Sequence, residues 1–154
     1  MIKRLLRGVW LNVPPRLRRL TMRLTNTRFT VTAGGIVINA EGQVLLVKHI
    51  FRAGTGWGIP GGFLKSGEQP IEGLRRELRE EIGLELDEIA LFEARSFKRP
   101  RQVELLYLCR TTSQAEPKSV EVDRAAWFST NSLPTGLPKD QRLLVERAVG
   151  NGAK

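Results

Sequence analysis

The stretch GGFLKSGEQPIEGLRRELREEIGL, residues 61–84, most constrains what this chain can fold into, because it joins a glycine-rich turn to a short charged helix. At about 100° per residue, four aliphatic side chains fall within roughly 80° of one another. These four are Ile71, Leu74, Leu78 and Ile82, whereas Glu77, Glu80 and Glu81 occupy a second sector and Arg75, Arg76 and Arg79 fall on the side away from the acids. The pattern predicts a helix that buries one stripe and gathers three carboxylates on another face.

The grouped glutamates have two explanations. Like charges three or four residues apart on a helix repel by roughly a few tenths of a kcal/mol per pair, and a solvated face is the ordinary setting of such a cluster. A bound divalent cation would reverse the repulsion, since Mg²⁺ prefers oxygen ligands and leaves positions open for substrate phosphates. The Gly61–Gly62 turn has no side chains to keep its backbone from the same ions or phosphates, and Gly67 lets Glu68 bend back toward the helix. The second explanation predicts chemistry on phosphates.

The same stretch resembles the Nudix box of the Nudix hydrolases, whose pattern is G-x5-E-x7-R-E-U-x-E-E-x-G-U with U aliphatic. Every fixed position is filled, by Gly62, Glu68, Arg76, Glu77, Leu78, Glu80, Glu81, Gly83 and Leu84. The preceding WGIPGG and the later AAWFSTNSLP also look like stretches that flank this box. The resemblance covers roughly residues 30–134. It implies the Nudix fold, an α/β (α+β) domain built as an α/β/α sandwich with a mixed β-sheet.

The resemblance also implies site residues and a cofactor. Metal-dependent hydrolysis of a nucleoside diphosphate derivative with Mg²⁺ or Mn²⁺ is expected, with Glu77, Glu80 and Glu81 as metal ligands. Glu68 would join or support them, Arg76 would orient a glutamate by charge-assisted hydrogen bonds, and the carbonyl of Gly61 or Gly62 would approach a metal. The general base is left open among Glu121, Glu77 and Glu80, because members of the family differ on this point.

The remaining sequence predicts one domain with unstructured ends. Strands are expected in FTVTAGGIVI, QVLLVKHI, EIALFEARSF, QVELLYLCR and AAWFS, and a final helix in PKDQRLLVERAVG with Gly150 as its stop. The glycine-rich HIFRAGTGWGIPGG is expected to be a loop without regular structure. The predicted organisation is a basic amphipathic segment over residues 1–28, a Nudix hydrolase domain over 29–150 and a tail over 151–154.

The basic segment carries almost the whole net charge of +9. Residues 1–40 contain 8 lysines and arginines and no acid, which leaves 17 basic against 16 acidic residues in the rest of the chain. Such a segment can contact RNA or a membrane surface. The alternative, which we favour from sequence, is a helix that packs its apolar stripe on the domain and leaves its arginines in water.

Substrate recognition is expected in loops rich in basic and aromatic residues. The loop KRPR, with Lys98 and Arg99 next to Phe97, and Arg52 in the glycine-rich loop are candidate substrate-binding residues together with Gly61. ADP-ribose or another nucleoside diphosphate sugar is the first substrate choice and a nucleoside triphosphate the second. A different class of function is a catalytically weak Nudix-fold module that binds RNA or an anionic membrane, although a complete box argues against lost activity.

The single cysteine and the hydropathy indicate in which cellular compartment the protein is expected. Cys109 follows the apolar run VELLYL and is expected in the core, and no run approaches the roughly 18 apolar residues that span a bilayer. A cytoplasmic location is expected. Whether the domain forms a homodimer is left open.

Overall fold

The computed structural model describes residues 13–151. Within them, a 7-stranded sheet lies between helices. The strands are β1 (Thr30–Ile38), β2 (Val44–His49), β3 (Trp57–Gly58), β4 (Gly61–Phe63), β5 (Glu88–Phe97), β6 (Gln102–Arg110) and β7 (Val122–Phe128), and the helices are α2 (Pro15–Thr25), α3 (Pro70–Ile82), α4 (Lys139–Asn151) and the 3-10 turn η1 (Thr130–Ser132).

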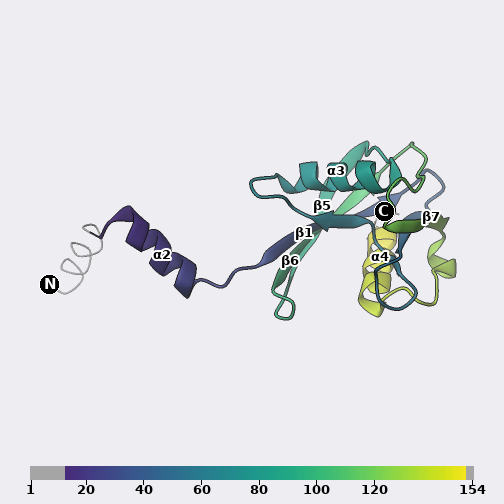
Figure 1. Cartoon of the computed structure of the whole chain (residues 1–154). Coiled ribbons are helices and arrows are strands. Elements are labelled where there is room, and N and C mark those ends of the chain that lie inside the picture. The colour runs from purple at the N-terminus through teal and green to yellow at the C-terminus, as the bar shows by residue number, and fades with distance from the viewer. Residues whose placement is uncertain (1–12, 152–154) are drawn as a thin grey trace.

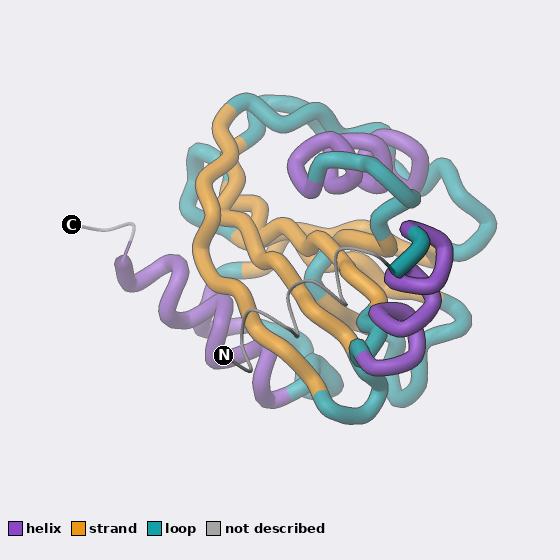
Figure 2. The backbone as a smooth tube through the Cα atoms, turned by 90° about the vertical axis from the view of Figure 1, so that its left-hand side faces the viewer, coloured by secondary structure: helices purple, strands orange, loops and turns teal. Residues whose placement is uncertain are grey.

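The sheet is mixed, as the sequence predicted. Its main path runs β3-β2-β1-β6-β5, with β4 paired to β1 and β7 paired to β2. Only the β1–β6 pairing is parallel among the described strands, and it extends from Thr30↔Gln102 to Ile38↔Arg110. Figure 2 shows these strands as one twisted layer with helices on its two sides. The parallel pair β1–β6 contributes buried side chains to both faces of the sheet.

Two hydrophobic cores form because the central strands are apolar on both faces. One face of the sheet packs against α3 through a cluster that includes Val37, Leu45, Leu74 and Leu78. The other face packs against α4, and its cluster includes Ile36, Leu46, Leu106, Leu144 and Val145. Near-continuous apolar runs are what a sheet buried on both faces requires. The result is the expected α/β/α sandwich (Figure 1), and Cys109 lies in its core.

Three local expectations are wrong. The glycine-rich stretch before α3 contains β3 and β4, since Trp57 pairs with Lys48 and the Gly61–Phe63 backbone pairs with β1. Ile71 is 38% exposed and does not join the buried stripe of α3, whereas Gly73 is buried and lies against the loop side chain of Leu64. Helix α4 runs through Gly150 to Asn151, so that glycine does not end it.

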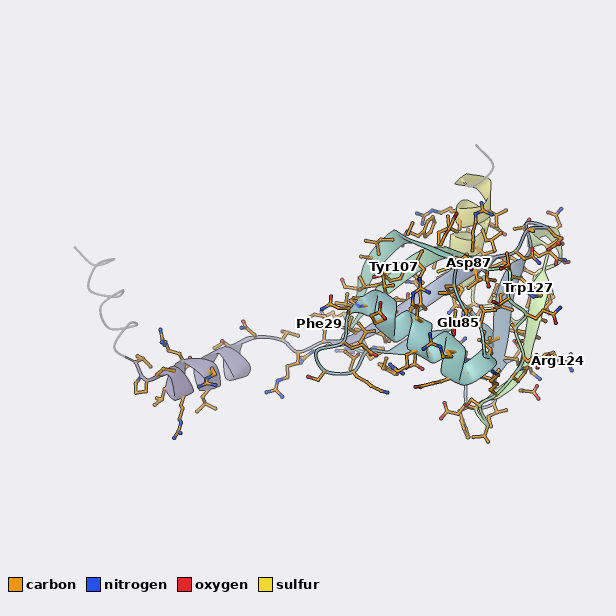
Figure 3. The ribbon with its side chains drawn as sticks, turned by 90° about the horizontal axis from the view of Figure 1, so that it is seen from above. Phe29, Glu85, Asp87, Tyr107, Arg124 and Trp127 are labelled. Atoms are coloured by element: carbon orange, nitrogen blue, oxygen red, sulfur yellow. The ribbon has the colours of Figure 1, made fainter. Side chains whose placement is uncertain are left out.

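Helix α2 does not pack on the domain in the way the sequence favoured. Figures 1 and 3 show it set apart from the sheet and joined to β1 by the short segment that contains Phe29. Leu17 and Leu20 are 55% and 53% exposed, so this part of the apolar stripe faces solvent. The part of the basic segment before residue 13 lies outside the described residues. None of the described helices combines the length and the apolar character that crossing a bilayer needs.

Candidate functional site

Helix α3 is fixed by its buried stripe and by its ends. Pro70 stands in its first turn, and Gly83 ends it in the left-handed conformation at φ 64°, where its N–H bonds to the carbonyl of Arg79. Leu74, Leu78 and Ile82 are fully buried against the sheet. This anchoring sets the rotation of the helix about its axis and turns its glutamates toward β4 and the loops at the edge of β2.

Arg76 organises the acids. Its Nε and Nη2 donate to the two carboxylate oxygens of Glu68 at 2.8 and 3.0 Å, while Nη1 donates to Glu77 at 2.8 Å and to Glu80 at 3.3 Å. The guanidinium and the backbone N–H of Lys65 lower the pKa of Glu68 to about 2. Both Glu68 oxygens are therefore engaged, so Glu68 supports the cluster through Arg76. The helical-wheel expectation that Arg76 faces away from the acids is wrong, because its long side chain reaches around to them.

Gly62 lets the Glu77 carboxylate approach the backbone of β4. A Cβ built on Gly62 would lie 2.5 Å from Glu77 Cδ and within 2.8 Å of both carboxylate oxygens. A larger residue here would force the flexible end of the Glu77 side chain to move away, so glycine permits this close contact. The structure thus brings the box glycine and the box glutamate together, and their sharing of an ion or phosphate stays a prediction.

Glu81 lies deeper than its neighbours and has a perturbed charge. Its Oε2 is buried without a hydrogen-bond partner among the described residues and lies 3.9 Å from His49 Nε2, which is also unpartnered. Burial first, and then the negative charges of Glu77 and Glu121, raise the pKa of Glu81 to about 7. Burial and the nearby Arg52 lower the pKa of His49. An uncompensated acid cluster of this kind is the environment that a cation stabilises.

Glu121 joins the same cluster from a segment that is distant in the sequence but bonded to the end of α3 and to the residue after β2. It lies in the turn before β7, where its carbonyl accepts from Ile50 N–H at 3.0 Å, and its charge acts on both Glu81 and His49. Asp123, two residues on, instead pairs with Lys48 at 2.8 Å. The structure therefore brings Glu121, and not Asp123, to the box glutamates.

The donor set fits a hard divalent ion. Carboxylate oxygens predominate, one buried oxygen of Glu81 is unpartnered, and the Gly62 backbone lies against Glu77. Within residues 13–151, no three His, Cys, Asp or Glu side chains already converge closely enough to enclose an ion. Arg76 forms ion pairs with Glu77 and Glu80, so its guanidinium holds two of the box carboxylates.

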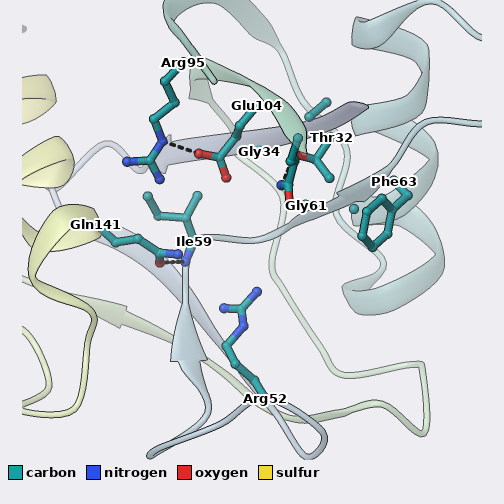
Figure 4. A pocket seen from close by; sticks show the side chains of 12 residues that line it. Thr32, Gly34, Arg52, Ile59, Gly61, Phe63, Arg95, Glu104 and Gln141 are labelled. Carbon is teal, nitrogen blue, oxygen red and sulfur yellow. Dashed lines mark hydrogen bonds and ion pairs between the residues drawn. The ribbon is translucent and has the colours of Figure 1, made fainter. Parts of the chain in front are cut away.

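A pocket of about 190 Å³ opens next to this cluster (Figure 4). Its walls come from β1, β4, β5, β6, α4 and the loop after β2, and its polar lining residues are Thr32, Arg52, Arg95, Gln102, Glu104 and Gln141. Gly61 and Gly62 both line it, and Gly62 also lies against the Glu77 carboxylate. Gly62 therefore borders both the pocket and the Glu77 carboxylate.

Arg52 connects the pocket with the acids. Its Nη1 is buried without a hydrogen-bond partner in the described structure, and burial lowers the pKa of its guanidinium while the charges of Glu81 and Glu104 raise it. The guanidinium lies against Gly58, where any Cβ would collide with it. A buried guanidinium with a free donor, placed between a pocket and an acid cluster, suits an anionic ligand. That Arg52 binds substrate stays a prediction from the sequence.

The far wall of the pocket is a charged pair. Arg95 donates to Glu104 on the neighbouring strand and pairs with Asp140 at 3.0 Å, and its guanidinium lies 5.0 Å from the centre of the Phe97 ring. Phe97 thus supports the wall through Arg95. Lys98 and Arg99 are exposed at the tip of the β5–β6 hairpin and do not line the pocket.

The chain resembles a known protein family and several of its members. A model of the NUDIX domain matches residues 28–148. The chain belongs to the Nudix hydrolase family. Among its relatives, the human 8-oxo-dGDP phosphatase NUDT18 is 33% identical over 142 residues, which are 88% of this chain and 41% of that protein. The putative ADP-ribose pyrophosphatase YjhB of Bacillus subtilis is 28% identical over 106 residues, 64% of this chain and 50% of that protein. The chain thus spans half or less of these relatives' length.

A solved Nudix structure gives the same fold. The NUDIX hydrolase of Nitrosomonas europaea superposes with a TM-score of 0.72 at 24% identity, covering 82% of this chain and 73% of that one. At that identity the likeness speaks for the fold alone. The Nudix box of the present chain accordingly lies on β4, the following loop and α3.

Several pocket residues were missed from sequence. Glu104, Gln141 and Arg95 carry no motif, and Gln141 reaches the pocket because its Oε1 accepts from Ile59 N–H at 2.8 Å. The one available signal for Arg95 and Glu104 was their placement in two predicted neighbouring strands on either side of the KRPR turn, where antiparallel pairing opposes them.

Proposed function

We propose that this Nudix protein is a metal-dependent pyrophosphohydrolase that cleaves the pyrophosphate linkage of a nucleoside diphosphate derivative by water attack on phosphorus. The observation that carries the proposal is that Gly62 lines the pocket and also lies against the Glu77 carboxylate, while Arg52 lines the same pocket and interacts electrostatically with Glu81. The acids would bind a metal cation and the guanidinium would bind anionic oxygens, so both can contact the phosphate chain of the same substrate.

In this proposal Glu77, Glu80 and Glu81 hold Mg²⁺ or Mn²⁺, with the Gly62 backbone beside them. The bound metal supplies charge neutralisation on the phosphoryl oxygens and a lowered pKa for water. Arg76 keeps Glu77 and Glu80 in place, since it contacts both, and Glu68 keeps Arg76 in place. The arrangement is a fixed set of ligands supported by a second layer of hydrogen bonds.

We assign the general base to Glu121. Glu77 and Glu80, the other candidates, are both held by Arg76. The Glu121 carboxylate has no ion pair or side-chain hydrogen bond among the described residues, yet it is close enough to influence Glu81. An acid that is near the cluster but not engaged by an arginine can take a proton from an attacking water.

The pocket would hold the nucleoside portion. Arg52 binds phosphate oxygens at the inner end, and the Glu104 carboxylate, fixed through Arg95, accepts hydrogen bonds from a base at the outer end. ADP-ribose or another nucleotide sugar remains the first substrate choice, supported by the name of the Bacillus relative, with nucleoside triphosphates next.

A second candidate is a guanine-type nucleoside diphosphate. Guanine presents two neighbouring N–H donors to a carboxylate on its pairing edge, whereas adenine presents one amino group. Glu104 therefore favours a guanine-type base, and the human relative is named for 8-oxo-dGDP. The two candidates differ in the base and in the group beyond the second phosphate.

The deciding experiment is a substrate panel. The protein is incubated with ADP-ribose, nucleotide sugars, nucleoside triphosphates, dGDP and 8-oxo-dGDP, with Mg²⁺, with Mn²⁺ or with EDTA, and products are resolved by chromatography. We expect metal-dependent release of a nucleoside monophosphate from at least one compound. If no compound is cleaved with either metal while the protein binds RNA or vesicles tightly, the binding-module alternative replaces the enzyme.

A further inference from the structure

Helix α2 carries a basic and apolar surface that the domain does not use. Its sequence, PRLRRLTMRLT, contains four arginines and no acid. Leu17 and Leu20 lie about 60° apart around the helix axis and Arg16 and Arg19 flank Leu20 on one side. Both leucines are more than half exposed. The helix therefore presents a narrow apolar stripe with cationic side chains along its border.

A second cationic feature lies at the same end of the molecule. The tip of the β5–β6 hairpin holds Lys98, Arg99 and Arg101, all exposed. Thr30, the first residue of β1, donates from its N–H at 3.0 Å and from its hydroxyl at 3.2 Å to the carbonyl of Arg101. The tip is thus fastened where the segment from α2 enters the sheet, as Figure 1 shows.

We propose that α2 and the β5–β6 hairpin tip together dock the protein on an anionic lipid bilayer. The leucine stripe would enter the boundary between headgroups and acyl chains, and the arginines of α2 and of the tip would meet the anionic headgroups. This goes beyond the proposed hydrolysis and does not depend on it.

The chemistry of α2 favours a bilayer over RNA. Recognition of single-stranded RNA relies on aromatic stacking and on side chains that read base edges. Residues 15–25 contain no aromatic residue and no Asn or Gln. Exposed leucines gain nothing from a phosphate backbone, but they gain free energy at the acyl boundary. The acid-free composition of residues 1–40 adds long-range attraction to a negative surface.

Vesicle co-sedimentation of the full chain tests the proposal. We expect binding to phosphatidylcholine vesicles that contain about 30% phosphatidylglycerol, little binding to pure phosphatidylcholine, and weaker binding at high salt. Arg19→Gln should lower the partition coefficient about fivefold, the effect of one cationic side chain near the surface. Leu17→Gln with Leu20→Gln should lower it about tenfold or more at unchanged charge.

Arg124→Gln is the matched control, because it removes the same charge from the end of the domain opposite α2 (Figure 3). It should bind vesicles like the unmodified chain. The proposal is overturned if Arg124→Gln loses as much binding as Arg19→Gln, if the leucine variant binds normally, or if a single-stranded RNA oligomer binds more tightly than anionic vesicles. Circular dichroism of each variant confirms that the domain is folded.

Discussion

Replacing Glu81 by glutamine should change how the stability of the metal-free protein depends on pH. The pKa of Glu81 is raised from its ordinary 4.5 to about 7 in the folded protein, chiefly by burial and by Glu77. Between these two values the folded state holds a proton that the unfolded state has released, so stability falls as pH rises toward 7 and levels off above it. From about pH 5 to about pH 8 the loss amounts to roughly 2 to 3 kcal/mol, since one pKa unit corresponds to roughly 1.4 kcal/mol.

Glu81→Gln removes this loss because its side chain does not titrate. Urea unfolding in EDTA, followed by tryptophan fluorescence at about pH 5 and pH 8, gives the stability difference between the variant and the unmodified chain at each pH. That difference should grow by roughly 2 to 3 kcal/mol in favour of the variant at the higher pH, whatever the constant cost of burying the amide. Glu72→Gln, an exposed acid on the same helix, should show no such growth. A difference independent of pH would refute the buried-acid reasoning.

Three further outcomes follow from the site. Gly62→Ala should retain the fold but lower the turnover number at least about tenfold, since the new Cβ would displace the Glu77 carboxylate; normal steady-state turnover would remove Gly62 from the site. Glu104→Gln should raise KM for guanine-type substrates more than for adenine ones, and an equal change for both, measured on the same panel, would argue against base reading by Glu104. Arg99→Ala should leave KM within about twofold at low salt, because the hairpin tip lies outside the pocket lining; a clear rise in KM would return the loop to the substrate-binding role predicted from sequence.

The sequence predicted α3 and its acids because helical periodicity is a local property. Leu74, Leu78 and Ile82 recur at helical spacing, and their burial fixes the face that carries Glu77, Glu80 and Glu81. Ile71 fits the same spacing, yet it is exposed, since the fold of the preceding loop decides what covers the first turn. The prediction for Arg76 was wrong for a related reason. A helical wheel gives only the direction of the Cα–Cβ bond, whereas the side chain of Arg76 is long enough for its guanidinium to reach Glu80.

The pocket was harder to predict because it depends on contacts between distant segments. Strands β3 and β4 have two and three residues, too few for any alternation, and exist because β2 and β1 pair with them. Gln141 lines the pocket only after α4 packs under the sheet, and Glu121 reaches Glu81 only after β7 pairs with β2. None of these contacts between distant segments can be predicted from the spacing of residues in the sequence.

The central claim is that the box glutamates hold the metal at which the pyrophosphate linkage is cleaved. Its most direct test is the turnover number of Glu80→Gln against Glu72→Gln with the best substrate and saturating Mg²⁺. Both variants lose one negative charge from α3, but only Glu80 belongs to the acid cluster held by Arg76. We predict a loss of at least about 100-fold for Glu80→Gln and less than about twofold for Glu72→Gln. A Glu80→Gln variant that turns over at the unmodified rate would contradict the account.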